Sequence, residues 1–111
     1  MFVGVLRLTF HIPHSRSLKD KRRVVQKLRD RIRARFDVSI AEVAAQDLLQ
    51  RAVFGVSVVS SDAAVCDSVL EQVARAAESV GDAVLTDRAT ELVTVGDDLY
   101  GGTSDDADDY A

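Results

Sequence analysis

Residues 2–12 read FVGVLRLTFHI, and this stretch decides the fold class. Large apolar side chains alternate with smaller or polar ones from Phe2 to Ile12. A period of two residues with branched and aromatic side chains predicts a half-buried β-strand. Pro13 ends the strand, because proline has no N–H to donate to a neighbouring strand. We therefore expect the even-numbered side chains to face a core and the odd-numbered ones to face away from it.

Downstream of this strand the apolar period changes to that of a helix and then changes back. Ser17 suits a helix N-cap with Asp20 as its partner, and Val25, Leu28 and Ile32 follow at helical spacing, which predicts a helix that ends near Arg35. Three further strands are predicted, over Phe36–Val43, Arg51–Ser60 and Val84–Val95. Between the last two, a second helix is predicted to begin at Ser61-Asp62 and to end at Gly81. Its apolar stripe consists of Val65, Val69, Val73, Ala76 and Val80.

The order of these elements is strand, helix, strand, strand, helix, strand. This order is the split βαβ pattern, which predicts a ferredoxin-like α+β domain over residues 1–95, with a four-stranded antiparallel sheet and two helices on one face. Residues 96–111 read GDDLYGGTSDDADDYA, with six Asp and no basic residue. Such a segment cannot bury enough apolar surface to offset its ordering entropy, so we expect an acidic disordered tail.

Charge is distributed unevenly along the chain. Residues 1–60 contain twelve Lys or Arg and five Asp or Glu, whereas residues 61–111 contain two and thirteen. Ten of the basic residues fall between Arg16 and Arg35, where the only acidic residues are Asp20 and Asp30. Clustered cations along a helix are typical of a phosphate-backbone contact, although many charge runs are solvated faces neutralised by nearby carboxylates. The candidate residues for binding RNA or another anion are Arg16, Lys19, Arg22, Arg23, Arg29 and Arg33.

Other classes of site have little support in the sequence. The chain has one cysteine and two histidines, and Cys66, His11 and His14 do not form the set of a closed metal site. No glycine-rich phosphate loop or hydrolase motif is present, so we expect neither a cofactor nor an enzyme. We also expect a cytoplasmic location, because the sequence has no signal-peptide pattern and no apolar run long enough to cross a membrane.

Three stretches, His11–Pro13, Ser15–Arg23 and Gln46–Ala52, resemble the YlxP-like family of bacterial proteins of unknown function. The resemblance covers Met1 to about Val95 and implies a ferredoxin-like fold. Because genes of this family often lie beside genes for translation initiation and ribosome maturation, it also implies an association with the ribosome. It implies no catalytic residue. Leu49 departs from the family pattern, in which Trp is frequent at this position.

The third of these stretches adds a candidate patch in the loop before the third strand. A binding patch and a hydrogen-bond cluster that orders the loop are equally expected for its four polar residues, which are Gln46, Asp47, Gln50 and Arg51. The sequence thus favours a non-enzymatic accessory protein that binds ribosomal RNA or the small ribosomal subunit through its first helix. The alternative is a homo-oligomeric interaction domain that uses the open sheet face and binds no nucleic acid.

Overall fold

The computed structural model describes residues 1–96 and residue 99, so the predicted acidic tail lies outside the described residues except at Gly96 and Leu99. None of the helices in this described part is both long and apolar enough to cross a membrane. In chain order the elements are β1 (Phe2–His11), α1 (Leu18–Arg35), β2 (Ser39–Ala44), β3 (Arg51–Ser60), α2 (Ala63–Glu78) and β4 (Val84–Thr94).

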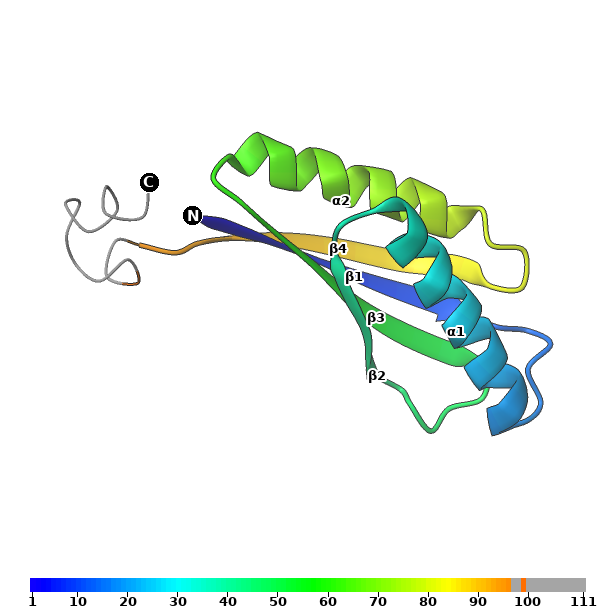
Figure 1. Ribbon diagram of the computed structural model, residues 1–111. Helices are drawn as coiled ribbons and strands as arrows, with labels where there is room; N and C mark the ends of the chain where they lie inside the picture. The colour runs from blue at the N-terminus through cyan, green and yellow to red at the C-terminus, as the bar shows by residue number, and fades with distance from the viewer. Residues whose placement is uncertain (97–98, 100–111) are drawn as a thin grey trace.

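The four strands form one antiparallel sheet in the order β2-β3-β1-β4, and both helices cover the same face of it (Figure 1). The prediction of a ferredoxin-like α+β fold is therefore confirmed. The other face of the sheet is left open. The sheet order places β1 and β3 in the centre and β2 and β4 at the edges. Of the four strands, α1 contacts mainly β2, so it lies beside that edge of the sheet.

The core follows the alternation predicted for β1. Leu6, Leu8 and Phe10 are buried beneath the helices, and Phe54 of β3 packs its ring edge-to-face against Phe10 with the ring centroids 5.8 Å apart. Direct strand pairing brings the even-numbered side chains of both central strands to one face. A largely aliphatic core with one aromatic pair thus forms between the sheet and the helices.

The predicted start of the second strand is wrong by three residues. The strand begins at Ser39, because Phe36 still belongs to the end of α1, where its backbone N–H bonds to Ile32 O at 2.9 Å. Phe36 and Val38 nonetheless pack against the core from the connecting segment. Their alternation reflected burial in an extended connection, which the period alone does not distinguish from a strand.

The buried face of α2 is rotated relative to the predicted stripe. Val65 is 45% exposed, whereas Cys66, Leu70 and Val73 are fully buried. The reason lies in β1, where Gly4 has no side chain and lets α2 approach the sheet closely at Cys66 and Leu70. Cys66 therefore belongs to the buried face of α2.

Gly4→Ala is expected to destabilise the fold by about 1–3 kcal/mol, because an added methyl overpacks a filled core. A Cβ on Gly4 would lie 2.8 Å from Leu70 Cδ1 and 3.1 Å from Cys66 Cβ, and buried Leu70 has no room to swing away. Urea unfolding measures the change. The matched control is Gly55→Ala on the open face, where the nearest group is the exposed side chain of Val43 and the change should stay within about 0.5 kcal/mol. Equal effects of the two substitutions would contradict this account.

Candidate nucleic-acid interface

The N-terminus of α1 is capped as the sequence predicts. Ser17 Oγ accepts a hydrogen bond from Asp20 N at 3.1 Å, and the Asp20 carboxylate accepts one from Arg16 N, also at 3.1 Å. These reciprocal bonds satisfy backbone donors that the first helical turn leaves free. The cap thus fixes where the helix begins and, with it, which side chains face outward.

One flank of α1 carries three of the predicted cations in a single row. The buried face of the helix consists of Lys21, Val25, Leu28 and Ile32. Residues 22, 29 and 33 follow at spacings of seven and four, which places them on one side of a helix. We call Arg22, Arg29 and Arg33 the arginine row.

The arginine row lies on the β2 side of α1 and is about 16 Å long at 1.5 Å per residue. Arg33 Nη2 donates to Ile40 O of β2 at 3.3 Å, and Arg29 Nη2 donates to Gln26 Oε1 at 2.8 Å. These bonds orient two guanidinium groups without neutralising them. The row is therefore a partly ordered set of charges at the β2 edge of the molecule.

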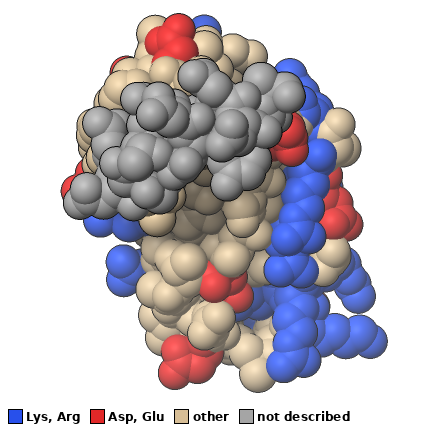
Figure 2. Space-filling view, turned by 60° about the vertical axis from the view of Figure 1, so that its left-hand side comes forward, with Lys and Arg blue, Asp and Glu red and all other residues tan. Residues whose placement is uncertain are grey.

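The other three predicted cations lie elsewhere on the same end of the molecule. Lys19 and Arg23 are on the outer surface of α1, and Arg16 is exposed just before the helix. Within residues 1–96 and 99, none of the six candidate cations makes an ion pair with a carboxylate. Figure 2 shows Lys and Arg side chains gathered in a column down one side of the molecule. The structure thus places five of the six candidates on two adjoining surfaces of α1, and Arg16 in the turn just before it.

Lys21 is one of the ten basic residues between Arg16 and Arg35, but its side chain is only 2% exposed. Its Nζ lies 2.9 Å from Glu42 Oε2 and donates to Ala45 O at 2.5 Å. Helical spacing could have predicted the burial of Lys21, because position 21 lies four residues before Val25 on the buried face. Lys21 therefore joins α1 to the end of β2 and contributes no charge to the surface.

The predicted loop patch divides into two pairs with different surroundings. Gln50 Nε2 donates to Pro13 O at 3.4 Å and to Ser15 O at 3.3 Å, and Gln46 Nε2 donates to Glu42 O at 3.3 Å. These two amides order the loop. Asp47 and Arg51, in contrast, have no hydrogen-bond or ion-pair partner for their side chains among the described residues.

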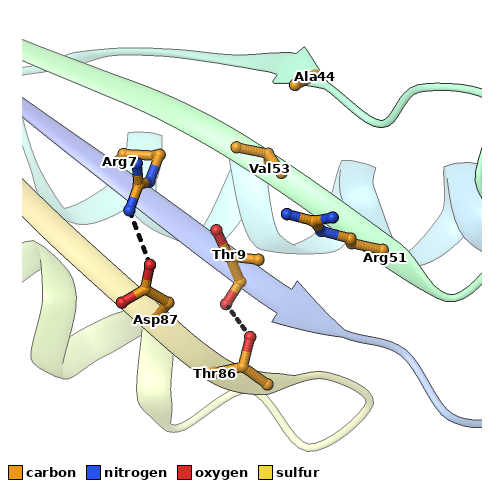
Figure 3. Close-up of a pocket in the computed structure, with 7 residues that line it drawn as sticks. All are labelled: Arg7, Thr9, Ala44, Arg51, Val53, Thr86 and Asp87. Carbon is orange, nitrogen blue, oxygen red and sulfur yellow. Dashed lines mark hydrogen bonds and ion pairs between the residues drawn. The ribbon is translucent and has the colours of Figure 1, made fainter.

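The two unpartnered side chains of the loop face different hollows. Asp47 lines one between α1 and the loop, and Arg51 lines another on the open sheet face. Figure 3 shows the second, of about 510 Å³, in which Arg7 pairs with Asp87 at 2.7 Å and Arg51 extends over the sheet. The four loop residues therefore do not form one patch.

Two residues on the open sheet face are nonetheless buried. Thr9 and its pairing partner Val53 both lie on this face, yet they are only 8% and 6% exposed. The longer side chains of Arg7 and Arg51 and the opposing edge strands surround them in the hollow of Figure 3. The outward positions of the four described strands carry no Phe, Tyr or Trp, and His11 is the one aromatic ring there on which a base could stack.

Comparison with known proteins places this arrangement in a family. The family model described as "Protein of unknown function (DUF503)" matches residues 3–90. The chain belongs to this family. The resemblance drawn from the sequence motifs is also confirmed by a relative, since the chain is 40% identical over 57 residues to "Uncharacterized protein YlxP" of Bacillus subtilis (strain 168).

The likenesses to individual proteins cover part of the sequence in one case and only the fold in the other. The match to the Bacillus subtilis protein spans 51% of this chain and 62% of that protein, less than two thirds of its length. Among solved structures, the chain is similar to "De novo designed protein Foldit4", with a TM-score of 0.50 and 10% identity over 86% of this chain and 100% of the designed one. That likeness concerns the fold alone. Within the described residues, no three His, Cys, Asp or Glu side chains are grouped as they would be to hold a metal ion.

Proposed function

We propose that this DUF503 protein is a non-enzymatic accessory protein that binds RNA through α1, with ribosomal RNA of the small subunit as its target. The observation that carries the proposal is the arginine row, whose three guanidinium groups have no carboxylate partner among the described residues. Guanidinium groups bind phosphate through two parallel hydrogen bonds. The row therefore offers successive phosphate contacts on one side of a rigid helix.

The competing explanation is that α1 is a solvated face whose charge is neutralised internally. Such neutralisation occurs at two positions, where Lys21 pairs with Glu42 and Lys27 pairs with Asp82 at 3.0 Å. Neither of these lysines belongs to the six candidates. Because the six candidate residues have no carboxylate partner among the described residues, this surface keeps a net positive charge, which favours an anionic partner.

The composition of the open sheet face favours RNA binding through α1 over RNA binding on the sheet. RNA-recognition motifs usually stack two or three bases on sheet aromatics, whereas the outward positions of the described strands carry no Phe, Tyr or Trp and a single imidazole, that of His11. RNA bound by this chain is therefore expected to be held mainly by its backbone. The ribosomal target rests on the gene neighbourhood of the family, which is a weaker support than the charge of α1.

The direct test is binding of the full chain to purified small ribosomal subunits and to a short single-stranded RNA across a salt series. Counterion release predicts a log–log slope of about −2 if only the arginine row contacts phosphates, and of about −4 if all six candidates do. Fluorescence anisotropy of labelled RNA gives the slope. A polyaspartate peptide of matched charge is the control for general anion binding. Absence of binding at low salt, or a flat slope, would refute the proposal.

The second candidate function is self-association through the open sheet face. It is favoured by three valines that are exposed on that face, Val43 at 58%, Val59 at 62% and Val93 at 42%. Exposed apolar side chains that share a face often mark an interface. Light scattering of the same sample gives the oligomeric state. A dimer that binds no RNA at low salt would make this candidate the leading one.

A further inference from the structure

A hollow of about 370 Å³ lies between α1 and the loop after β2, directly beside the arginine row. Arg22, the first member of the row, forms part of its lining. Leu18 and Val25 of α1 give the hollow an apolar wall, and Leu18 is 42% exposed there. The hollow thus combines an apolar surface with the start of a phosphate-binding row.

The opposite wall of the hollow is formed by the loop and presents hydrogen-bond acceptors. Gln46 directs its Nε2 to Glu42 O, which leaves its carbonyl oxygen as an acceptor. Asp47 contributes a carboxylate with no partner among residues 1–96 and 99. Lys21, which also lines the hollow, is engaged with Glu42 and Ala45. The Asp47 carboxylate on this wall therefore favours a ligand that supplies donors to it.

The Asp47 carboxylate would oppose a ligand that bound here only through its RNA phosphates. A carboxylate beside a phosphate-binding row repels the strand that the row attracts, and like charges in proximity disfavour each other. The same carboxylate becomes favourable when it accepts hydrogen bonds from a base edge. Its place in the hollow beside Arg22 therefore indicates recognition of a base.

The identity of the base follows from the arrangement of donors. On its Watson–Crick edge guanine places two donors, N1–H and the N2 amino group, side by side, which matches the two oxygens of one carboxylate. Adenine and cytosine each offer one amino group beside an acceptor, and uracil offers one N–H between two acceptors. A carboxylate, which only accepts, thus discriminates against all three.

We propose that this hollow binds a guanine base of single-stranded RNA, with Asp47 accepting from N1–H and N2–H and with the flanking phosphates on the arginine row. The proposal rests on the RNA-binding function proposed above. Leu18 and Val25 contact one face of the base, and the guanidinium plane of Arg22 covers it from the rim, as Arg does with splayed bases. Hydrogen bonding to guanine is thereby assigned to Asp47, and phosphate binding to the arginine row.

The test compares three RNA octamers on the full chain by fluorescence anisotropy. These are oligouridine, oligouridine with one central guanosine, and the same octamer with inosine, which lacks the N2 amino group. A good bidentate contact predicts about tenfold tighter binding of the guanosine octamer than of oligouridine, with most of the gain lost for inosine. Asp47→Asn should abolish the guanosine preference and leave oligouridine binding equal or tighter. Asp67→Asn, at an exposed position of α2, is the matched control and should preserve the preference.

The outcomes separate the two proposals. Binding of all three octamers with equal affinity and a steep salt slope overturns the guanine site and leaves the RNA-binding function intact. A guanosine preference that survives Asp47→Asn also overturns the site. Absence of binding to every octamer at low salt overturns both.

Discussion

Lys21→Met is expected to lower the free energy of unfolding by about 3–5 kcal/mol, because it removes one partner of a buried ion pair. The Glu42 side chain is only 16% exposed, and its carboxylate would be left without its cation. Ala45 O would lose its donor as well. An unpaired buried charge and an unpaired buried carbonyl are both costly in a poorly solvated site. Urea denaturation followed by far-UV circular dichroism measures the change.

Two further variants make the test of Lys21 specific. Lys19→Met removes an exposed lysine from the same helix and should change stability by no more than about 0.5 kcal/mol. The double variant Lys21→Met/Glu42→Leu replaces the whole pair by apolar side chains and should recover most of the loss, as substitutions of buried ion pairs often do. A loss below about 1 kcal/mol for Lys21→Met would show that water reaches the pair and supports it in place of the protein.

Reversal of the arginine row is expected to weaken RNA binding by about a hundredfold near 0.1 M salt, because three phosphate contacts are lost. The variant is Arg22→Glu/Arg29→Glu/Arg33→Glu. Its salt slope on single-stranded RNA should be shallower than that of the unmodified chain by about 2. Anisotropy with the same RNA gives both quantities. The fold should persist, since all three side chains lie outside the buried face of α1.

The control for this variant has the same net charge and changes the same helix. Lys27→Glu/Arg31→Glu/Arg35→Glu reverses three other cations of α1, at the cost of one exposed ion pair with Asp82 and one cation–π contact of Arg35 with Phe36. If binding depends on the row, this control keeps most of its affinity. Equal loss in the two variants would mean that net charge, and not the row, determines binding.

The sequence predicted the fold well because its signals are local. Strict alternation in β1 and the Ser17–Asp20 cap define elements whose order allows one common antiparallel topology. The misplaced boundary at Ser39 and the exposed Val65 depend instead on packing between distant segments. The close approach of α2 at Gly4 is an example, since no pattern within α2 reports it.

The candidate site was predicted less completely, and the reasons are also physical. Charge composition identified α1 as the basic element but not which of its cations are neutralised. Lys21 shows this clearly, because its partner Glu42 comes from a different element. Similarly, the spacing of Asp47 and Arg51 in one loop suggested one patch, whereas the chain enters β3 between them and turns the two side chains to different hollows.

The loop that follows β2 is tied to the rest of the molecule at both of its ends. Lys21 holds the start of the loop at Ala45, where the backbone has a positive φ of 59°, and Gln50 holds its end at the turn before α1. Much of the conformational entropy of this segment is therefore lost during folding and not during association. A preorganised loop of this kind keeps the entropic penalty of binding small. If α1 binds RNA as proposed, we expect the rate of association to be governed by the long-range attraction between α1 and the polyanion, and not by a rearrangement of this loop that must precede contact.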